Sequence, residues 1–179
     1  PRLCRDWSSD VCSSDLDTAM YKAKELGKNC YQMFNKTIND VIMKKSEIER
    51  ELRYAIDRDQ LRLYYQPIFD IVTGGIISAE ALLRWQHPEK GMISPMDFIP
   101  VAEETGLIKP IGDWVIREAC RQNRYWQELS LPKIKVAVNI SCYQFQQRDL
   151  LEIIKAILGE TKLDPSYLSI EITDRKSVV

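Results

Sequence analysis

Three segments of the chain alternate between aliphatic residues and small or polar residues with a period of two. They are residues 75–84, 134–140 and 168–172. This alternation is typical of β-strands that bury one face, because successive side chains point to opposite sides of a strand. Each strand is therefore predicted to have an apolar face that packs under helices and a smaller, more polar face. The second faces carry Ser78, Glu80, Arg84, Ala137, Asn139, Ser141, Ser169, Glu171 and Thr173, and Leu82 is the one apolar exception.

Amphipathic helices are expected between the later strands, at about 112–129 and 146–159. Strands that alternate with helices favour parallel βαβ units and an α/β fold. The first two strands, 62–69 and 75–84, are joined only by residues 70–75. A parallel crossover needs about a dozen residues or more, so these two strands are predicted to pair antiparallel around the turn at 73–75.

The polar face of the predicted sheet gathers two carboxylates and an amide: Glu80, Asn139 and Glu171. A carboxylate in an otherwise apolar strand is costly unless it is paired or holds a metal ion. Each residue also has a simpler interpretation. A glutamate in a strand commonly faces solvent, an asparagine commonly caps a backbone group, and Arg84 could be an ion-pair partner of Glu80.

Five segments, in this order, closely resemble the EAL domain, a family of cyclic di-GMP phosphodiesterases. They are 64–68 (Tyr-Tyr-Gln-Pro-Ile), 80–85 (Glu-Ala-Leu-Leu-Arg-Trp), 94–103, 138–141 (Val-Asn-Ile-Ser) and 171–173 (Glu-Ile-Thr). The resemblance covers residues 47–173, whereas a complete TIM-type barrel needs about 250 residues. We therefore expect a partial TIM-type (β/α) barrel with an antiparallel first strand, about the first half of the barrel.

The resemblance implies a metal site and a nucleotide site. Glu80, Asn139 and Glu171 would be metal ligands, because Mg²⁺ or Mn²⁺ prefers hard oxygen donors, and the intact domain would hold two ions. Gln66 and Arg84 would hold cyclic di-GMP, since a guanidinium suits bidentate contact with a phosphate. The implied reaction is metal-dependent hydrolysis of cyclic di-GMP to linear pGpG by the intact parent protein.

The family pattern also contains residues that this chain does not show. An Asp-Asp pair, a lysine, a further glutamate and a glutamine belong to later strands of the family barrel. No catalytic residue is therefore identified in the chain, and the chain by itself is expected to be inactive. The alternative is that the parent is a catalytically silent EAL domain, which acts as a cyclic di-GMP sensor or a protein-interaction module.

The ends of the chain are expected to be foreign to the domain. Residues 1–16 and 174–179 resemble translated sequencing adapters. Residues 17–35 resemble the C-terminal end of a GGDEF domain, with a pattern Ala-Met-Tyr-x-Ala-Lys-x-x-Gly-Lys-Asn at 19–29, although generic helix and strand chemistry could also produce it. A linker helix region is expected at 36–46, either as a connector between signalling domains or as an ordinary amphipathic helix. A capping box of Ser46 and Glu49 would restart or reinforce that helix.

Composition bounds the partners and the compartment. The 25 basic and 26 acidic residues give a net charge of −1, so no global field attracts a nucleic-acid polymer or an anionic membrane. No apolar run reaches the roughly 20 residues of a membrane span. Cys30, Cys120 and Cys142 are isolated thiols, which favours a cytoplasmic location, including the cytoplasmic part of a larger membrane-anchored protein. A homodimer of the intact parent is compatible with the resemblance.

The single histidine, His87, precedes a proline in a predicted loop and is not expected to be catalytic.

Overall fold

The computed structural model describes residues 36–146 and 149–173. The predictions for residues 1–35 and 174–179 lie outside this range. The chain divides into two compact units, Pro1–Ile48 and Glu49–Val179. Residues 36–48, the described part of the first unit, are helical and belong to helix α2 (Lys36–Leu52), which has no break at Ser46, so the helix does not restart there.

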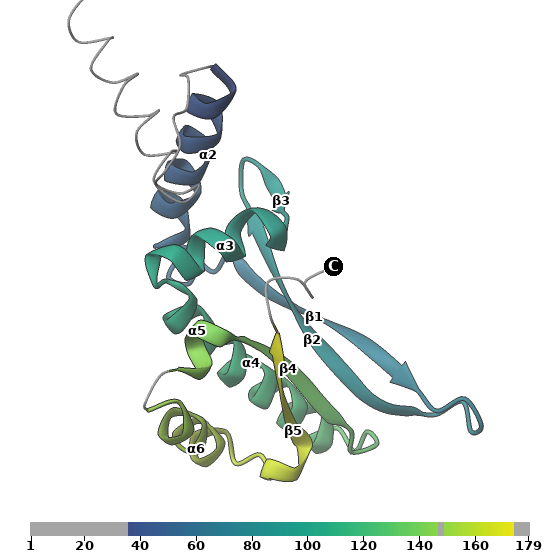
Figure 1. Ribbon diagram of the computed structural model, residues 1–179. Helices are drawn as coiled ribbons and strands as arrows, with labels where there is room; N and C mark the ends of the chain where they lie inside the picture. The colour runs from purple at the N-terminus through teal and green to yellow at the C-terminus, as the bar shows by residue number, and fades with distance from the viewer. Residues whose placement is uncertain (1–35, 147–148, 174–179) are drawn as a thin grey trace, which may run out of the picture. The chain divides into compact units, whose positions relative to one another are not determined.

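The second unit is built on one mixed sheet with the strand order β1-β2-β4-β5 (Figure 1). The strands are β1 (Leu61–Phe69), β2 (Ile76–His87), β4 (Lys135–Ser141) and β5 (Leu168–Thr173). β1 and β2 pair antiparallel, whereas β2 with β4 and β4 with β5 pair parallel. The predicted α/β fold and the antiparallel first pair are confirmed.

The structure extends the second strand beyond its predicted end. β2 continues to His87 and pairs with a short strand, β3 (Gly91–Ile93), that the sequence pattern did not predict. The chain reverses through the turn at residues 88–90, and the first residue after the turn, Gly91, has a φ of 69°, a left-handed conformation that suits a residue without a Cβ. The prediction that His87 lies in a loop was therefore wrong, since His87 is the last residue of a strand and is buried.

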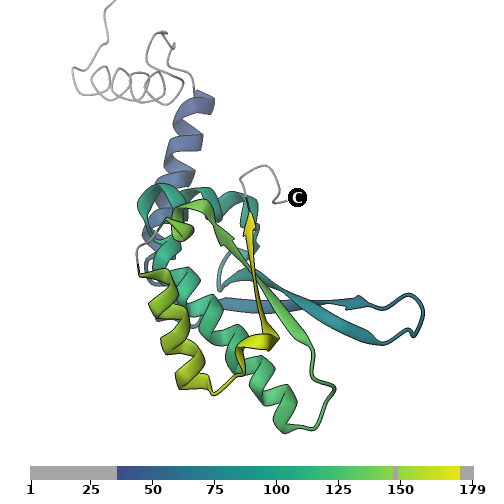
Figure 2. The same ribbon diagram turned by 60° about the horizontal axis from the view of Figure 1, so that its bottom comes forward.

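Helices cover the apolar face of the sheet (Figure 2). The main one is α4 (Ile108–Glu128), which packs against β4 and β1 and is contacted in turn by α6 (Leu150–Thr161). Helix α3 (Pro95–Thr105) has Ser94 as its N-cap and packs against β2. A short helix, α5 (Cys142–Phe145), follows β4, and a 3-10 turn, η1 (Pro165–Tyr167), precedes β5. The short α5 explains why α6 starts later than the pattern predicted.

Tyr65 joins the sheet to α4 on the apolar face. Its ring meets Trp126 edge to face, with ring centroids 4.8 Å apart. Its hydroxyl is buried without a hydrogen-bond partner among the described residues, and this burial raises the pKa of the Tyr65 hydroxyl well above its usual range. An unpartnered buried hydroxyl costs free energy that a matching apolar side chain avoids.

Replacing this tyrosine is therefore expected to stabilise the protein. Tyr65→Phe keeps the ring contact and removes the unpartnered hydroxyl, so the free energy of unfolding should rise by about 1 kcal/mol. Urea denaturation measures this change. Tyr125→Phe on α4, where the side chain is exposed, is the control and should have no measurable effect. A loss of stability in Tyr65→Phe would show that the hydroxyl has a partner in solution.

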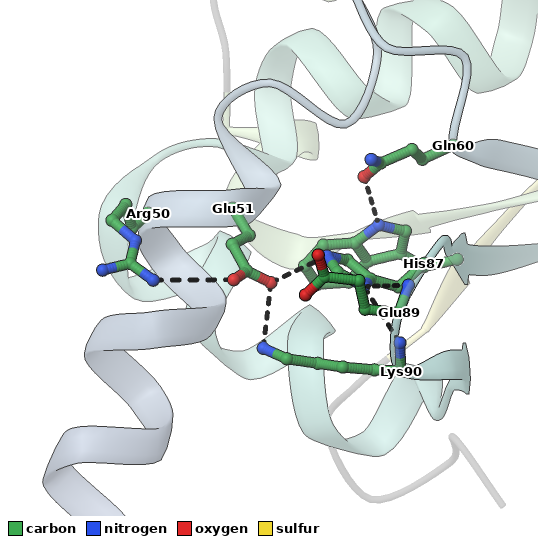
Figure 3. Close-up of polar contacts among 7 residues, drawn as sticks. Arg50, Glu51, Gln60, His87, Glu89 and Lys90 are labelled. Atoms are coloured by element: carbon green, nitrogen blue, oxygen red, sulfur yellow. Dashed lines mark hydrogen bonds and ion pairs between the residues drawn. The ribbon is translucent and has the colours of Figure 1, made fainter.

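A cluster of polar and aromatic side chains ties the end of α2 to the end of β2 (Figure 3). His87 Nε2 lies 2.9 Å from Glu51 Oε2, and His87 Nδ1 accepts hydrogen bonds from the backbone N–H groups of Glu89 and Lys90, both at 3.2 Å. Because Nδ1 is an acceptor, the proton of a neutral His87 is on Nε2, the nitrogen that lies beside Glu51. His87 is therefore fully satisfied as a structural residue.

Glu51 is the acceptor at the centre of this cluster. Lys90 Nζ donates to Glu51 Oε2 at 2.9 Å, and Arg50 lies 3.6 Å from Glu51 Oε1. The hydrogen bond from Lys90, with the charges of Lys90 and His87, holds the pKa of Glu51 below its ordinary value of 4.5. A carboxyl whose pKa is lower in the folded state stabilises the fold above its ordinary pKa, and the stabilisation is lost as the pH falls through the folded value.

The stability of the protein should accordingly depend on pH through Glu51. Glu51→Gln is expected to lower the free energy of unfolding by about 1 kcal/mol at neutral pH, because the charge-assisted bonds to Lys90 and His87 are weakened. The difference from the unmodified protein should shrink as the pH falls below 4.5. Glu49→Gln is the matched control on the same helix, since the ion pair of Glu49 is with the exposed Arg53. A difference that persists unchanged at acid pH would contradict this role for the carboxylate.

Candidate functional site

The candidate metal ligands come from three adjacent strands and lie on one face of the sheet. Asn139 in β4 is the cross-strand partner of Glu171 in β5. Glu80 in β2 is the partner of Ala137, two residues before Asn139. Cross-strand partners share a face, and so do residues two apart along a strand. All three side chains are therefore directed away from the face that α4 covers.

One hydrogen bond joins two of the three residues. Asn139 Nδ2 donates to Glu80 Oε1 at 2.6 Å, across a sequence separation of 59 residues. Glu80 and Asn139 are half-buried, whereas Glu171 is exposed. Because Asn139 Nδ2 donates to Glu80 Oε1, the Oδ1 atom of Asn139 and the Oε2 atom of Glu80 remain as acceptors. The atoms that these three residues offer to a ligand are therefore oxygens.

This donor set fits a hard divalent cation. Two carboxylates and one amide oxygen are the ligand types that Mg²⁺ and Mn²⁺ prefer. Within residues 36–146 and 149–173, no group of three or more His, Cys, Asp and Glu side chains is placed to hold a metal ion. The candidate site has only two carboxylates, so the amide of Asn139 would have to be the third ligand.

The two candidate nucleotide-binding residues lie on the same face. Gln66 in β1 is the direct cross-strand partner of Glu80, and its side chain is exposed. Arg84 is four residues further along β2 than Glu80, and the alternation of side chains places it on the same side. Its Nη1 donates to the carbonyl oxygen of Leu83 at 2.8 Å. The face thus presents a cation and an amide beside the carboxylates.

The alternative that Arg84 is the ion-pair partner of Glu80 is not what the structure shows. In the described part of the chain, Arg84 forms no ion pair with Glu80, which instead accepts from Asn139. The guanidinium lies over the ring of Tyr64, 6.0 Å from the ring centroid. Its charge therefore remains available for an anion.

The end of β4, which carries Asn139, is held by contacts that the sequence analysis did not identify. Ser141 caps α5 in a reciprocal capping box: it accepts from the N–H of Gln144, and the Gln144 side chain accepts from the N–H of Ser141 at 3.2 Å. Gln144 fills the space beside Gly112 of α4, where any Cβ would overlap it. The Ser-x-x-Gln spacing at 141–144 is the signal that could have predicted the cap.

Sequence comparison identifies the family. The sequence profile of the EAL domain matches residues 49–178, which is most of the chain. The chain belongs to the EAL domain family. The expected resemblance and the expected partial barrel are thereby confirmed, because solved EAL domain structures share the fold.

Relatives of this EAL chain include enzymes of cyclic di-GMP turnover. The chain is 42% identical over 158 residues to the bifunctional diguanylate cyclase/cyclic di-GMP phosphodiesterase MucR of Pseudomonas aeruginosa, which covers 88% of the chain and 23% of MucR. It is 39% identical over 158 residues to the cyclic di-GMP phosphodiesterase PdeR of Escherichia coli, covering 88% of the chain and 24% of PdeR. The chain thus spans about a quarter or less of the length of these curated relatives.

A solved structure of the MucR phosphodiesterase in complex with c-di-GMP aligns with the EAL chain at a TM-score of 0.69 and 42% identity. The alignment covers 74% of this chain and 53% of the MucR chain.

No helix in residues 36–146 or 149–173 combines the length and the apolar character needed to cross a membrane.

Proposed function

We propose that the intact parent of this EAL domain hydrolyses cyclic di-GMP to linear pGpG with the help of Mg²⁺ or Mn²⁺. The observation that carries the proposal is the joint placement of Glu80, Asn139 and Glu171 in three adjacent strands on one face, with Gln66 and Arg84 beside them. The relatives named as cyclic di-GMP phosphodiesterases support the choice of substrate.

The proposed roles follow from the chemistry of each group. Glu80, Asn139 and Glu171 would hold the metal through oxygen atoms, and the bond from Asn139 Nδ2 orients the amide so that its Oδ1 serves as the ligand. The metal, when bound, stabilises negative charge on the phosphoryl oxygens and lowers the pKa of water. Gln66 and Arg84 bind and orient the dinucleotide, Arg84 through charge-assisted contacts to a phosphate. The isolated spacing of Cys30, Cys120 and Cys142 in the sequence supports a cytoplasmic location for this domain.

The competing function is binding without turnover. A catalytically silent EAL domain would bind cyclic di-GMP as a sensor or bind a protein partner. The two carboxylates and the amide disfavour this alternative, because a binding site for a dianionic nucleotide gains nothing from carboxylates that hold no metal. A homodimer of the parent is compatible with either function.

The test compares the intact parent with the 179-residue chain. The parent is expected to convert cyclic di-GMP to pGpG in the presence of Mg²⁺ or Mn²⁺ and to lose this activity when EDTA removes the metal. Calorimetric binding of cyclic di-GMP without turnover would instead identify the silent sensor. Absence of both binding and turnover would overturn the proposal.

The 179-residue chain alone is expected to show no hydrolysis. Its sheet ends in two edge strands, β1 and β5, and its candidate site supplies two carboxylates for two expected metal ions. Edge strands also expose unpaired backbone groups, so low solubility is expected. Chromatographic detection of pGpG after incubation with the purified chain measures the activity. Metal-dependent turnover by the chain would contradict the prediction that the remaining ligands are required.

A further inference from the structure

Tyr64 is a half-exposed aromatic residue on the same face as the candidate site. Its neighbour Tyr65 packs against Trp126 on the opposite face, so the alternation in β1 directs Tyr64 toward the side of Gln66. Tyr64 is the cross-strand partner of Leu82. On the same face, the pair of Gln66 and Glu80 lies on one side of it, and the pair of Arg62 and Arg84 lies on the other. Tyr64 is 51% exposed and stands in β1 at the level of Leu82, between the levels of Glu80 and Arg84 along β2.

Arg84 is held by two contacts, and Tyr64 supplies one of them. The carbonyl oxygen of Leu83 accepts from Arg84 Nη1 at 2.8 Å, and the guanidinium carbon lies 6.0 Å from the centroid of the Tyr64 ring. The negative face of an aromatic ring attracts a guanidinium placed over it. In the described part of the chain no carboxylate pairs with Arg84, so the ring orients the cation without neutralising its charge.

We propose that Tyr64 is a positioning residue that holds the Arg84 guanidinium for a phosphate of a cyclic dinucleotide. This inference rests on the proposed function, since it deepens the role of Arg84 in the same site. A carboxylate partner would also fix the arginine, but it would compete with the phosphate for the guanidinium N–H donors. An aromatic ring fixes the plane of the guanidinium and leaves most of those donors available to the nucleotide.

The experiment measures the steady-state kinetics of the intact parent with cyclic di-GMP. Tyr64→Leu removes the ring, and the KM is expected to rise about two- to five-fold with kcat within about two-fold, the size of an exposed cation–π contact. Tyr64→Phe keeps the ring face and is expected to recover most of this loss. The matched control is Tyr54→Leu, because Tyr54 is 49% exposed, lies in the turn segment between α2 and β1, and has its ring 5.0 Å from the guanidinium carbon of Arg58. Tyr54→Leu should leave KM and kcat unchanged.

A double-mutant cycle shows whether Tyr64 acts through Arg84. The dissociation constant of cyclic di-GMP is measured by calorimetry for Tyr64→Leu, for Arg84→Ala and for both together. If Tyr64 acts by positioning Arg84, adding Tyr64→Leu to Arg84→Ala should weaken binding no further. A full additional loss in the double variant would mean that the ring contacts the nucleotide directly and would overturn the positioning role.

Failure of this inference can be told apart from failure of the proposed function. If the unmodified parent hydrolyses cyclic di-GMP and Tyr64→Leu leaves KM unchanged, only the role of Tyr64 is wrong. If the unmodified parent neither binds nor hydrolyses cyclic di-GMP, the proposed function is wrong and this inference falls with it.

Discussion

Glu80→Gln in the intact parent is expected to lower the rate of cyclic di-GMP hydrolysis by about three orders of magnitude, since a lost metal ligand removes several kcal/mol of charge stabilisation. The substitution keeps the size of the side chain and replaces a charged oxygen donor with an amide. Glu80 makes one hydrogen bond among those described, from Asn139, and a glutamine oxygen can still accept it. The fold should therefore remain intact, as measured by circular dichroism and thermal unfolding.

The matched control for Glu80→Gln is Glu128→Gln. Glu128 lies at the end of α4, where its carboxylate pairs with Arg124 on the surface, so the same chemical change there should not alter the rate. Asn139→Ala is expected to reproduce the loss of Glu80→Gln, because it removes a ligand and the bond that orients Glu80. Near-normal turnover in either site variant would refute the metal assignment and favour the sensor.

Trp85→Ala is expected to lower the free energy of unfolding by about 3–5 kcal/mol, the largest stability change among the substitutions considered for this chain. The side chain of Trp85 is fully buried. Its ring meets Phe98 of α3 and His87 with centroid distances of 5.5 and 5.9 Å, and its Nε1 donates to Gln60 Oε1 at 3.1 Å. The truncation leaves a cavity and an unpartnered buried amide.

Two further variants separate the cavity from the hydrogen bond. Trp85→Phe keeps an aromatic ring and loses the bond to Gln60, so its cost should be clearly smaller than that of Trp85→Ala. Tyr125→Ala, at a position exposed on α4, should change stability by no more than about 0.5 kcal/mol. Chemical denaturation measures all three. A cost near zero for Trp85→Ala would contradict the central place of this side chain in the core.

The alternation of residues along each strand determined which side chains share a face. It placed Glu80, Asn139 and Glu171 with the small and polar residues, opposite the aliphatic ones, and the sheet has this arrangement. The short connection at 70–75 determined the antiparallel pairing of β1 and β2. Both inferences succeed because they depend on local geometry, the period of a strand and the reach of a loop.

The register between strands was decided only by the tertiary structure. The alternation does not say that Glu80 stands opposite Ala137, yet this offset places Asn139 Nδ2 within 2.6 Å of Glu80 Oε1. Register depends on how the helices pack against the apolar face, and residues far apart in the chain determine that packing. The sequence therefore indicated the candidate ligands but not the bond between two of them.

His87 shows the same division most clearly. A histidine before a proline has the local pattern of a loop, but β2 continues to His87, because β3 pairs with the end of β2 and the His87 ring lies 2.9 Å from Glu51 of α2. The amino-acid sequence by itself determined the presence of β1, β2, β4 and β5, the two faces of the last three of these strands, and the family to which the chain belongs. Only the tertiary structure decided the partners of His87, Glu80 and Arg84, because contacts between segments distant in the chain leave no periodic signal in the sequence.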